Sequence, residues 1–251
     1  MEFSELKAFM DEKAYQYEHP DFIESDPIQI PRSYQLKEDI EIAGFLAATI
    51  AWGNRKSIIK NAKSMMDRMG NSPYDFIINA KEHHLDALDG FVHRTFNAED
   101  FKCFVLNLRE IYSNHGGLEY QFSGTSSIQE QISDFKALFF SEHFLQRSTK
   151  HLADPKKGSA AKRINMFLRW MVRPNTKGVD LGIWKAIPTS KLSCPLDVHT
   201  ANVSRKLGLV KRNQNDHKTL LELDHSLRMM DANDPVKYDY ALFGLGVFEK
   251  F

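Results

Sequence analysis

The chain has 251 residues, enough to bury a sizeable core in one large helical domain or in two lobes. Its 33 basic and 33 acidic residues leave no net charge, so attraction to nucleic acid has to come from local clusters of charge. The only two cysteines, Cys103 and Cys194, exclude a disulfide framework and an iron–sulfur cluster held by four thiolates.

The sequence contains neither a membrane span nor a signal peptide. No apolar run approaches the ~20 residues that a spanning helix requires, and the residues from Met1 to Leu6 lack the basic-then-apolar order of a secretion signal. We therefore expect a cytoplasmic monomer with no membrane partner, no cofactor and no metal ion.

Helical periodicity runs through the first half of the chain. Residues 4–17 have the spacing of a helix, and 26–31, interrupted by prolines, should form an extended connector. Residues 38–51 are apolar around most of a helical circumference, which is typical of a helix buried on several sides. A further helix is expected over 56–69, with Gly70 as its stop.

The middle of the chain continues this pattern. We expect a short helix from Ser72, a capped helix start at Asn97 followed by apolar spacing over 101–112, a flexible loop over 116–124 and an amphipathic helix over 126–148. No convincing period-two strand is present. The sequence therefore predicts an all-α fold of helices joined by short turns.

The segment from Ser159 to Arg173 predicts a helix with two different faces. One face has the spacing of a core stripe and contains Ile164, Phe167, Leu168 and Met171. The other face is cationic and contains Lys162, Arg169 and Arg173.

Lys162 is the candidate nucleophile of this helix. If Ser159 is the N-cap, Lys162 occupies the third helical position, where free N–H groups and the helix dipole disfavour a second positive charge and lower its pKa. A neutral amine can attack a sugar carbon and form a Schiff base. The alternative is an ordinary solvated lysine on an amphipathic helix.

A second helix is expected to begin just after Asp197 and to end before Gly208. The Asp197 carboxylate then lies at the start of the helix, where it can serve as a catalytic group. It can equally act only as an N-cap that accepts a hydrogen bond from a backbone N–H.

The run Pro-Leu-Asp197-Val-His-Thr-Ala-Asn-Val-Ser-Arg-Lys-Leu-Gly-Leu209 resembles the Val-Asp-Thr-His-Val-x-Arg-Val-x-x-Arg-Leu-Gly signature of helix-hairpin-helix DNA glycosylases. The resemblance implies that Asp197 is the catalytic acidic residue. Bifunctional members carry a catalytic lysine on a preceding helix, and the Lys162 helix is similar to that of the archaeal 8-oxoguanine glycosylase branch. The resemblance thus assigns the Schiff-base role to Lys162.

The likeness extends over most of the chain. Residues 39–54 and 234–246 are similar to the buried first-domain helix and to the last helix of these enzymes, and the Lys162–Arg173 run resembles an uncharacterised bacterial family of the superfamily. The implied structure is a single continuous unit, 1–251, with a two-lobed glycosylase-like fold. Its lobes would be 36–150 and 151–251, with 1–35 packing against the second lobe.

One element of the superfamily is altered. The usual Leu-Pro-Gly-Val-Gly hairpin, whose N–H groups hold a DNA phosphate, is replaced by the segment 178–191. Gly178 and Gly182 are expected to form a modified hairpin. The cations Lys177, Lys185 and Lys191 either contact backbone phosphates or are ordinary loop lysines.

Further contacts to nucleic acid are expected from Arg169, Arg173, His199 and Arg205. Trp170 and Trp184 are candidates for holding a flipped base, although core packing is the commoner role of tryptophan. Asn54 is a candidate for a polar contact to the lesion strand, or else belongs to a helix-ending turn.

The leading hypothesis is a base-excision repair glycosylase acting on damaged duplex DNA, with abasic-site lyase activity through Lys162 and Asp197. The alternative is a non-catalytic nucleic-acid-binding protein that retains the glycosylase architecture. A metal-dependent hydrolase built on Asp197, His199, His217, Asp224 or His225 is disfavoured, because no HExxH spacing or recognised metal-ligand geometry is present.

Overall fold

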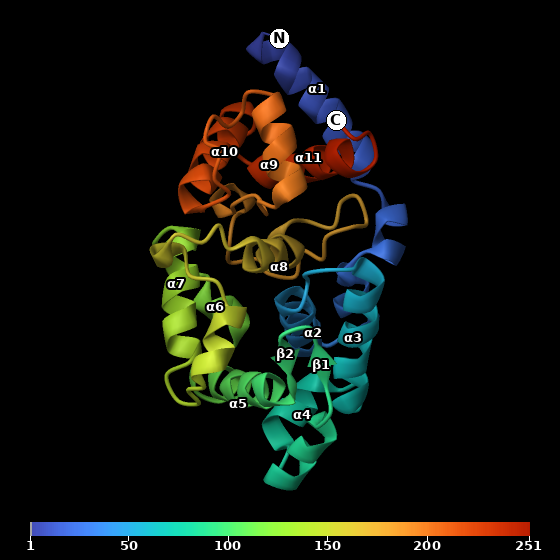
Figure 1. Ribbon diagram of the computed structural model, residues 1–251, viewed down its shortest axis with the longest axis vertical. Coiled ribbons are helices and arrows are strands. Elements are labelled where there is room, and N and C mark those ends of the chain that lie inside the picture. Colours follow the sequence, from blue (N-terminus) through green and yellow to red (C-terminus); the bar gives the residue numbers. More distant parts are fainter. Residues whose placement is uncertain (1) are drawn as a thin grey trace. The chain divides into compact units, whose positions relative to one another are not determined.

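The computed structural model describes residues 2–251, and its regular structure is almost entirely helical (Figure 1). The prediction of an all-α fold is confirmed. In chain order the α-helices are α1 (Phe3–Tyr17), α2 (Lys37–Thr49), α3 (Arg55–Arg68), α4 (Pro73–Asn79), α5 (Ala98–Asn114), α6 (Leu118–Gln121), α7 (Ile128–Phe139), α8 (Lys162–Val172), α9 (Val198–Lys206), α10 (His217–Met230) and α11 (Tyr238–Val247).

Short elements complete the fold. Two strands, β1 (Val92–His93) and β2 (Phe96–Asn97), form an antiparallel hairpin in which Val92 faces Asn97 and His93 faces Phe96. The 3₁₀ helices span Pro20–Ser25, Pro27–Gln29, Pro31–Ser33, Glu82–Leu88, Gln146–His151, Pro155–Lys157, Thr189–Lys191 and Pro235–Lys237.

The chain folds into two compact units. The first comprises the residues up to Phe22, Ser127–Glu130 and Asp154–Phe251, and the second comprises Ile23–Ser126 and Gln131–Ala153. Helix α1 therefore groups with the carboxy-terminal part of the chain. Residues 23–35, which we expected there as well, belong to the second unit, because their proline-initiated 3₁₀ turns bury Ile28 and Ile30 and pack on α2.

Three local expectations differ from the structure. The connector 26–31 is a pair of 3₁₀ turns, since Asp26 caps the first turn by accepting from the Ile28 N–H. The expected loop 116–124 contains α6. The helix expected over 126–148 ends at Phe139, because the Asn107 amide holds the backbone of His143 through both its N–H and its carbonyl.

The second unit is built around the nearly fully buried helix α2, as its sequence predicts. The ring of Phe45 packs against those of Phe104, Phe135 and Phe139, with centroids 5.6–6.0 Å apart. The many phenylalanines of the sequence thus form an aromatic core in which edge and tilted contacts predominate.

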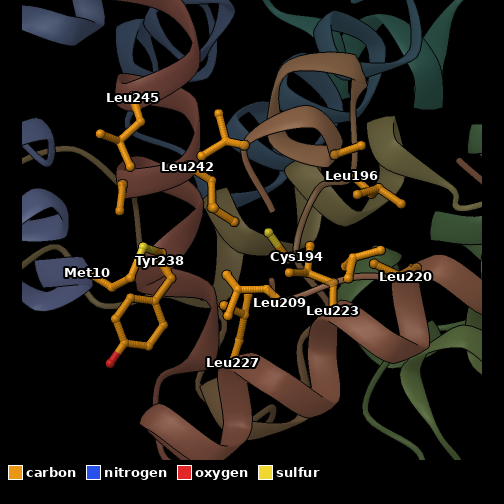
Figure 2. Close-up of a cluster of buried hydrophobic side chains, with 14 of the residues drawn as sticks. Met10, Cys194, Leu196, Leu209, Leu220, Leu223, Leu227, Tyr238, Leu242 and Leu245 are labelled. Atoms are coloured by element: carbon orange, nitrogen blue, oxygen red, sulfur yellow. The ribbon is translucent and has the colours of Figure 1, made fainter. Parts of the chain in front are cut away.

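The first unit has a separate apolar core, shown in Figure 2, to which α1, α9, α10 and α11 contribute. Met10 of α1, Leu227 of α10 and Leu242 of α11 are all fully buried there. Helix α1 packs closely on α11, and Gly244 permits this approach because a Cβ at that position would overlap the ring of Tyr17. This core supports the segments that carry Lys162 and Asp197.

Within residues 2–251, no helix combines the length and the apolar character needed to cross a bilayer.

Candidate active site

Lys162 is the first residue of α8, so the expectation that Ser159 caps this helix is wrong. The preceding residue, Ala161, adopts the left-handed conformation at φ +49° and provides no side-chain cap. Ser159 instead closes a tight turn in which its Oγ accepts from the Ala161 N–H at 3.1 Å. Lys162 therefore lies at the positive end of the helix dipole, at the first position of α8 and not at the third.

The Lys162 side chain is half-buried, and its Nζ lies 3.7 Å from Sδ of Met166. No carboxylate in the described part of the chain forms an ion pair with it. Close to this lysine, the buried Asn165 amide donates to the Ala160 carbonyl at 3.1 Å and accepts from Gln129 at 2.9 Å. These bonds fix the backbone turn from which Lys162 projects.

Asp197 is the N-cap of α9. Its Oδ1 accepts from the Thr200 N–H at 2.9 Å, and the residue is partly exposed, followed by the exposed Val198 and His199. The capping role predicted from the sequence is thus present. Among residues 2–251, nothing else donates a hydrogen bond to this carboxylate, so Oδ2 has no donor from the protein.

Asp239 of α11 connects the two candidate residues. Burial raises the pKa of the Asp239 carboxyl to about 6, the positive charges of Arg169 and Lys162 oppose this shift, and the negative charge of Asp197 adds to it. The charges of Lys162 and Asp197 therefore act on the same buried carboxyl, in opposite directions.

Arg169 and Arg173 do not form a cationic surface, contrary to the prediction for this helix. Each is only 5% exposed, because α11 and the loop after α8 cover this face. Arg169 pairs with Asp239 and, at 3.3 Å, with Asp180. Arg173 pairs with Glu18, with Asp180 at 3.1 Å and with Asp234 at 2.9 Å. Their burial disfavours the predicted role in phosphate contact.

The buried arginines and carboxylates form one network. Tyr240 donates through its hydroxyl to Asp180 at 2.9 Å, and the Arg169 guanidinium lies 4.4 Å from the centroid of its ring. The network joins the end of α1, helix α8, the following loop and helix α11. A buried charge that loses its partner destabilises the folded protein. Movement of one segment away from the others is therefore costly, and the network holds the segments in this arrangement.

The two tryptophans of the prediction belong to the core. Trp170 is 0% exposed and Trp184 is 1% exposed, and Trp184 packs edge-on against Phe167 with ring centroids 5.3 Å apart. Neither ring is open to a flipped base in this structure. The indole Nε1 of Trp170 has no hydrogen-bond partner among the described residues.

The segment between α8 and α9 turns back on the end of α8. The N–H groups of Leu181 and Gly182 donate to the Trp170 carbonyl at 2.8 and 3.3 Å, and that of Trp184 donates to Met171 at 2.9 Å. Gly182 is required in this turn, since its φ is +58° and a Cβ would lie 2.9 Å from the Arg173 carbonyl oxygen. These N–H groups close the helix and are therefore not available to hold a phosphate.

The predicted loop cations are placed differently from one another. Lys177 is half-buried, with its Nζ 3.7 Å from the centroid of the Tyr15 ring. Lys185 is exposed, and Lys191 is partly exposed in the short 3₁₀ helix. Phosphate contact by these residues stays a prediction.

Arg205 has an internal role that the sequence did not indicate. Its guanidinium donates to the carbonyls of Arg212 at 2.7 Å, Asn213 at 2.9 Å and Gln214 at 3.1 Å. The side chain therefore holds the loop between α9 and α10. His199 is exposed on α9, and a Cβ added at Gly246 of α11 would lie 3.1 Å from its Cβ.

Asn54 lies in the second compact unit, where it is the N-cap of α3 and accepts from the Ser57 N–H at 3.2 Å. It begins a helix, whereas the alternative interpretation placed it in a helix-ending turn. Its proposed contact with a lesion strand stays a prediction.

Sequence reasoning missed the buried carboxylate of Asp239, and it considered Asp224 only as a disfavoured metal ligand. The signal that could have identified Asp239 is a carboxylate within the strongly apolar helix α11. Its Oδ1 lies 3.7 Å from Sγ of Cys194. Asp224 accepts from the Cys194 N–H at 2.9 Å, and burial raises its pKa to about 6. In the part of the chain that the structure describes, no group of three or more His, Cys, Asp or Glu has the arrangement of a metal site.

The fold is that of an all-α protein with a lysine at the start of α8 and an aspartate at the start of α9, and the charges of both act on the buried Asp239 carboxyl. Residues 26–248 match the model of a family described as "Protein of unknown function (DUF2400)", and the chain belongs to that family. No curated protein and no solved structure matches the chain.

Proposed function

We propose that this protein is a DNA base-excision glycosylase with an associated abasic-site lyase step. The observation that carries the proposal is the placement of Lys162 and Asp197 at the starts of two helices, α8 and α9. The charges of both residues act on the pKa of the buried Asp239 carboxyl. The motif around Asp197, which resembles that of helix-hairpin-helix glycosylases, supports the same assignment.

The reaction follows from the two side chains. The unprotonated Lys162 amine forms a bond to C1′ of the damaged nucleotide while the C1′–N bond to the base breaks, and the base leaves with the bonding electron pair. Asp197 stabilises the positive charge that develops on the sugar and accepts the proton lost from the amine. Asp197 then returns this proton to O4′ as the C1′–O4′ bond opens, and the nitrogen lone pair completes the Schiff base. Loss of a C2′ proton and departure of the 3′ phosphate complete the β-elimination that cleaves the strand.

Borohydride trapping tests this proposal. Wild-type protein is incubated in the presence of borohydride with duplexes that carry an abasic site, 8-oxoguanine, uracil or an alkylated purine. The covalent complexes are separated and quantified on a gel. We expect trapping with at least one duplex, and its loss in Lys162→Gln. The matched control is Lys157→Gln, an exposed lysine close in sequence to α8, which should trap as the wild type does.

The role of Asp197 needs a variant that preserves the helix cap. Serine is a good N-cap, so Asp197→Ser keeps a cap for the Thr200 N–H and removes only the carboxylate. Asp216 is the matched control, because it caps α10 by accepting from the Thr219 N–H at the same 2.9 Å. We expect Asp197→Ser to lose activity and Asp216→Ser to retain it.

The capping bond of Asp197 favours a second candidate, a non-catalytic protein that binds nucleic acid. In that case no duplex yields a trapped complex or a released base, and both serine variants bind DNA as the wild type does. This pattern would contradict the glycosylase proposal.

A further inference from the structure

Helix α3, in the second compact unit, carries three lysines on one face. Lys56, Lys60 and Lys63 are all exposed, and their spacing places them within a narrow arc of the helix. The opposite face is fixed in the core by Ile58, Ala62, Met65 and Met66. The packing of the helix therefore directs the lysines toward solvent.

These lysines have no ionic partner. Within residues 2–251, no acidic side chain pairs with any of the three, although Asp67 lies one turn after Lys63. In α1, by contrast, Lys7 and Asp11 form an ion pair at the same spacing. Like charges one turn apart destabilise a helix, so this arrangement opposes folding.

Arg94 at the tip of the β1–β2 hairpin extends the cationic surface. It is exposed, and its guanidinium lies so close to Gly53 that a Cβ there would be 2.7 Å from Nη1. In the described chain no carboxylate pairs with Arg94. Its φ of +55° is a conformation in which hairpin turns favour Asn or Gly, so an arginine here also opposes folding.

The hairpin is anchored on α3 (Figure 1), where β1 packs against that helix. Nδ1 of the buried His93 lies 2.8 Å from Nδ2 of Asn61, and its Nε2 lies 3.2 Å from the Trp52 carbonyl oxygen. Arg94, the residue after His93, is thereby held beside the start of α3. Arg94 is therefore a fourth cation at the end of α3 where the row of lysines begins.

We propose that this surface, formed by Lys56, Lys60, Lys63 and Arg94, binds the backbone phosphates of nucleic acid, with duplex DNA as the expected partner. The lysines extend over about 10 Å of the helix axis, which corresponds to about three phosphates of one strand. The net neutrality of the chain means that such a local cluster has to supply the attraction. The inference goes beyond the proposed chemistry, because a non-catalytic binder would use the same surface.

Salt-dependent binding tests the proposal. The affinity for a labelled duplex is measured from 50 to 200 mM salt for wild type and for the variant Lys56→Gln/Lys60→Gln/Lys63→Gln. Each lost phosphate contact should reduce the slope of log K against log salt by about 1, and the affinity at low salt should fall by about tenfold or more. Arg94→Gln should reduce the slope by about 1 as well.

The control has the same change in charge at other exposed lysines: Lys81→Gln/Lys211→Gln/Lys218→Gln. The proposal is supported if the slope of log K against log salt decreases more in the α3 variant than in the control. Thermal melting checks that both variants are folded. Equal slopes in the two variants, or no duplex binding by the wild type at 50 mM salt, would overturn it. Binding to phosphatidylserine vesicles without binding to DNA would also overturn it and identify a lipid surface as the partner.

The two proposals can fail separately. If no lesion duplex yields a trapped complex, but the salt slope of the α3 variant is still lower than that of its control, the lyase proposal is contradicted and the binding surface is supported. If trapping occurs and the α3 variant has the same salt slope as the wild type, the glycosylase and lyase reaction is supported, and the α3 surface is not the DNA contact.

Discussion

Glu18 and Arg173 lie far apart in the chain and form a buried ion pair, in which Nη2 of Arg173 donates to Oε2 of Glu18 at 2.9 Å. Glu18 precedes residues 26–248, the part that matches the family model. The segment before the matched region therefore contributes to the ionic network next to the candidate site.

The first prediction concerns this ion pair. Glu18→Gln leaves Arg173 with a buried charge that is only partly compensated, and we expect the free energy of unfolding in urea to fall by about 3 kcal/mol. Glu12→Gln removes an exposed carboxylate from α1 and should change stability little. Equal stability of the two variants would contradict a structural role for Glu18.

The second prediction concerns the packing of α1 on α11. Gly244→Ala places a methyl group against the Tyr17 ring, and we expect a loss of about 1–3 kcal/mol in the free energy of unfolding. In a Tyr17→Ala background the same substitution should have almost no effect, because the clash is absent. A double-mutant cycle measures this coupling, and an additive result would argue against close packing at Gly244.

The third prediction concerns pH. Burial raises the pKa of Asp224 from 3.8 to about 6, so the folded state binds this proton more tightly than the unfolded state. The resulting stabilisation is complete below about pH 4 and is lost as the pH rises through about 6. Asp224→Asn removes this contribution and can still accept from the Cys194 N–H. Urea unfolding from pH 4 to 7 should show that the variant becomes less stable relative to wild type as the pH falls, and a constant difference would contradict the assignment.

The fourth prediction concerns Arg205, which holds the carbonyls of the α9–α10 loop. Arg205→Gln should accelerate amide hydrogen exchange around residues 212–215 and leave the salt dependence of DNA binding unchanged. If Arg205→Gln leaves amide exchange unaltered and reduces the salt dependence of DNA binding, the result would instead support the phosphate-binding role predicted from the sequence.

Local features of the candidate site were predictable from the sequence. Helical spacing predicted the helix that contains Phe167 and Met171, and the carboxylate before Val198 predicted the N-cap of α9. Both depend on interactions within a few residues, which the order of amino acids specifies directly. Ser159 was assigned wrongly as a cap because the left-handed turn at Ala161 delays the start of α8.

The surroundings of α8 were decided by the tertiary structure. By residue type, Arg169 and Arg173 belong on a surface, and Trp170 belongs either in the core or in a base pocket. The carboxylates that bury Arg169 and Arg173 come from Glu18, Asp180, Asp234 and Asp239, most of them far away in sequence. The sequence by itself therefore determined the helical elements, the apolar stripe and the Asp197 cap. Only the tertiary structure decided which charged side chains are buried and which are exposed to solvent. A buried cation requires anionic partners from other segments, and helical periodicity does not specify them.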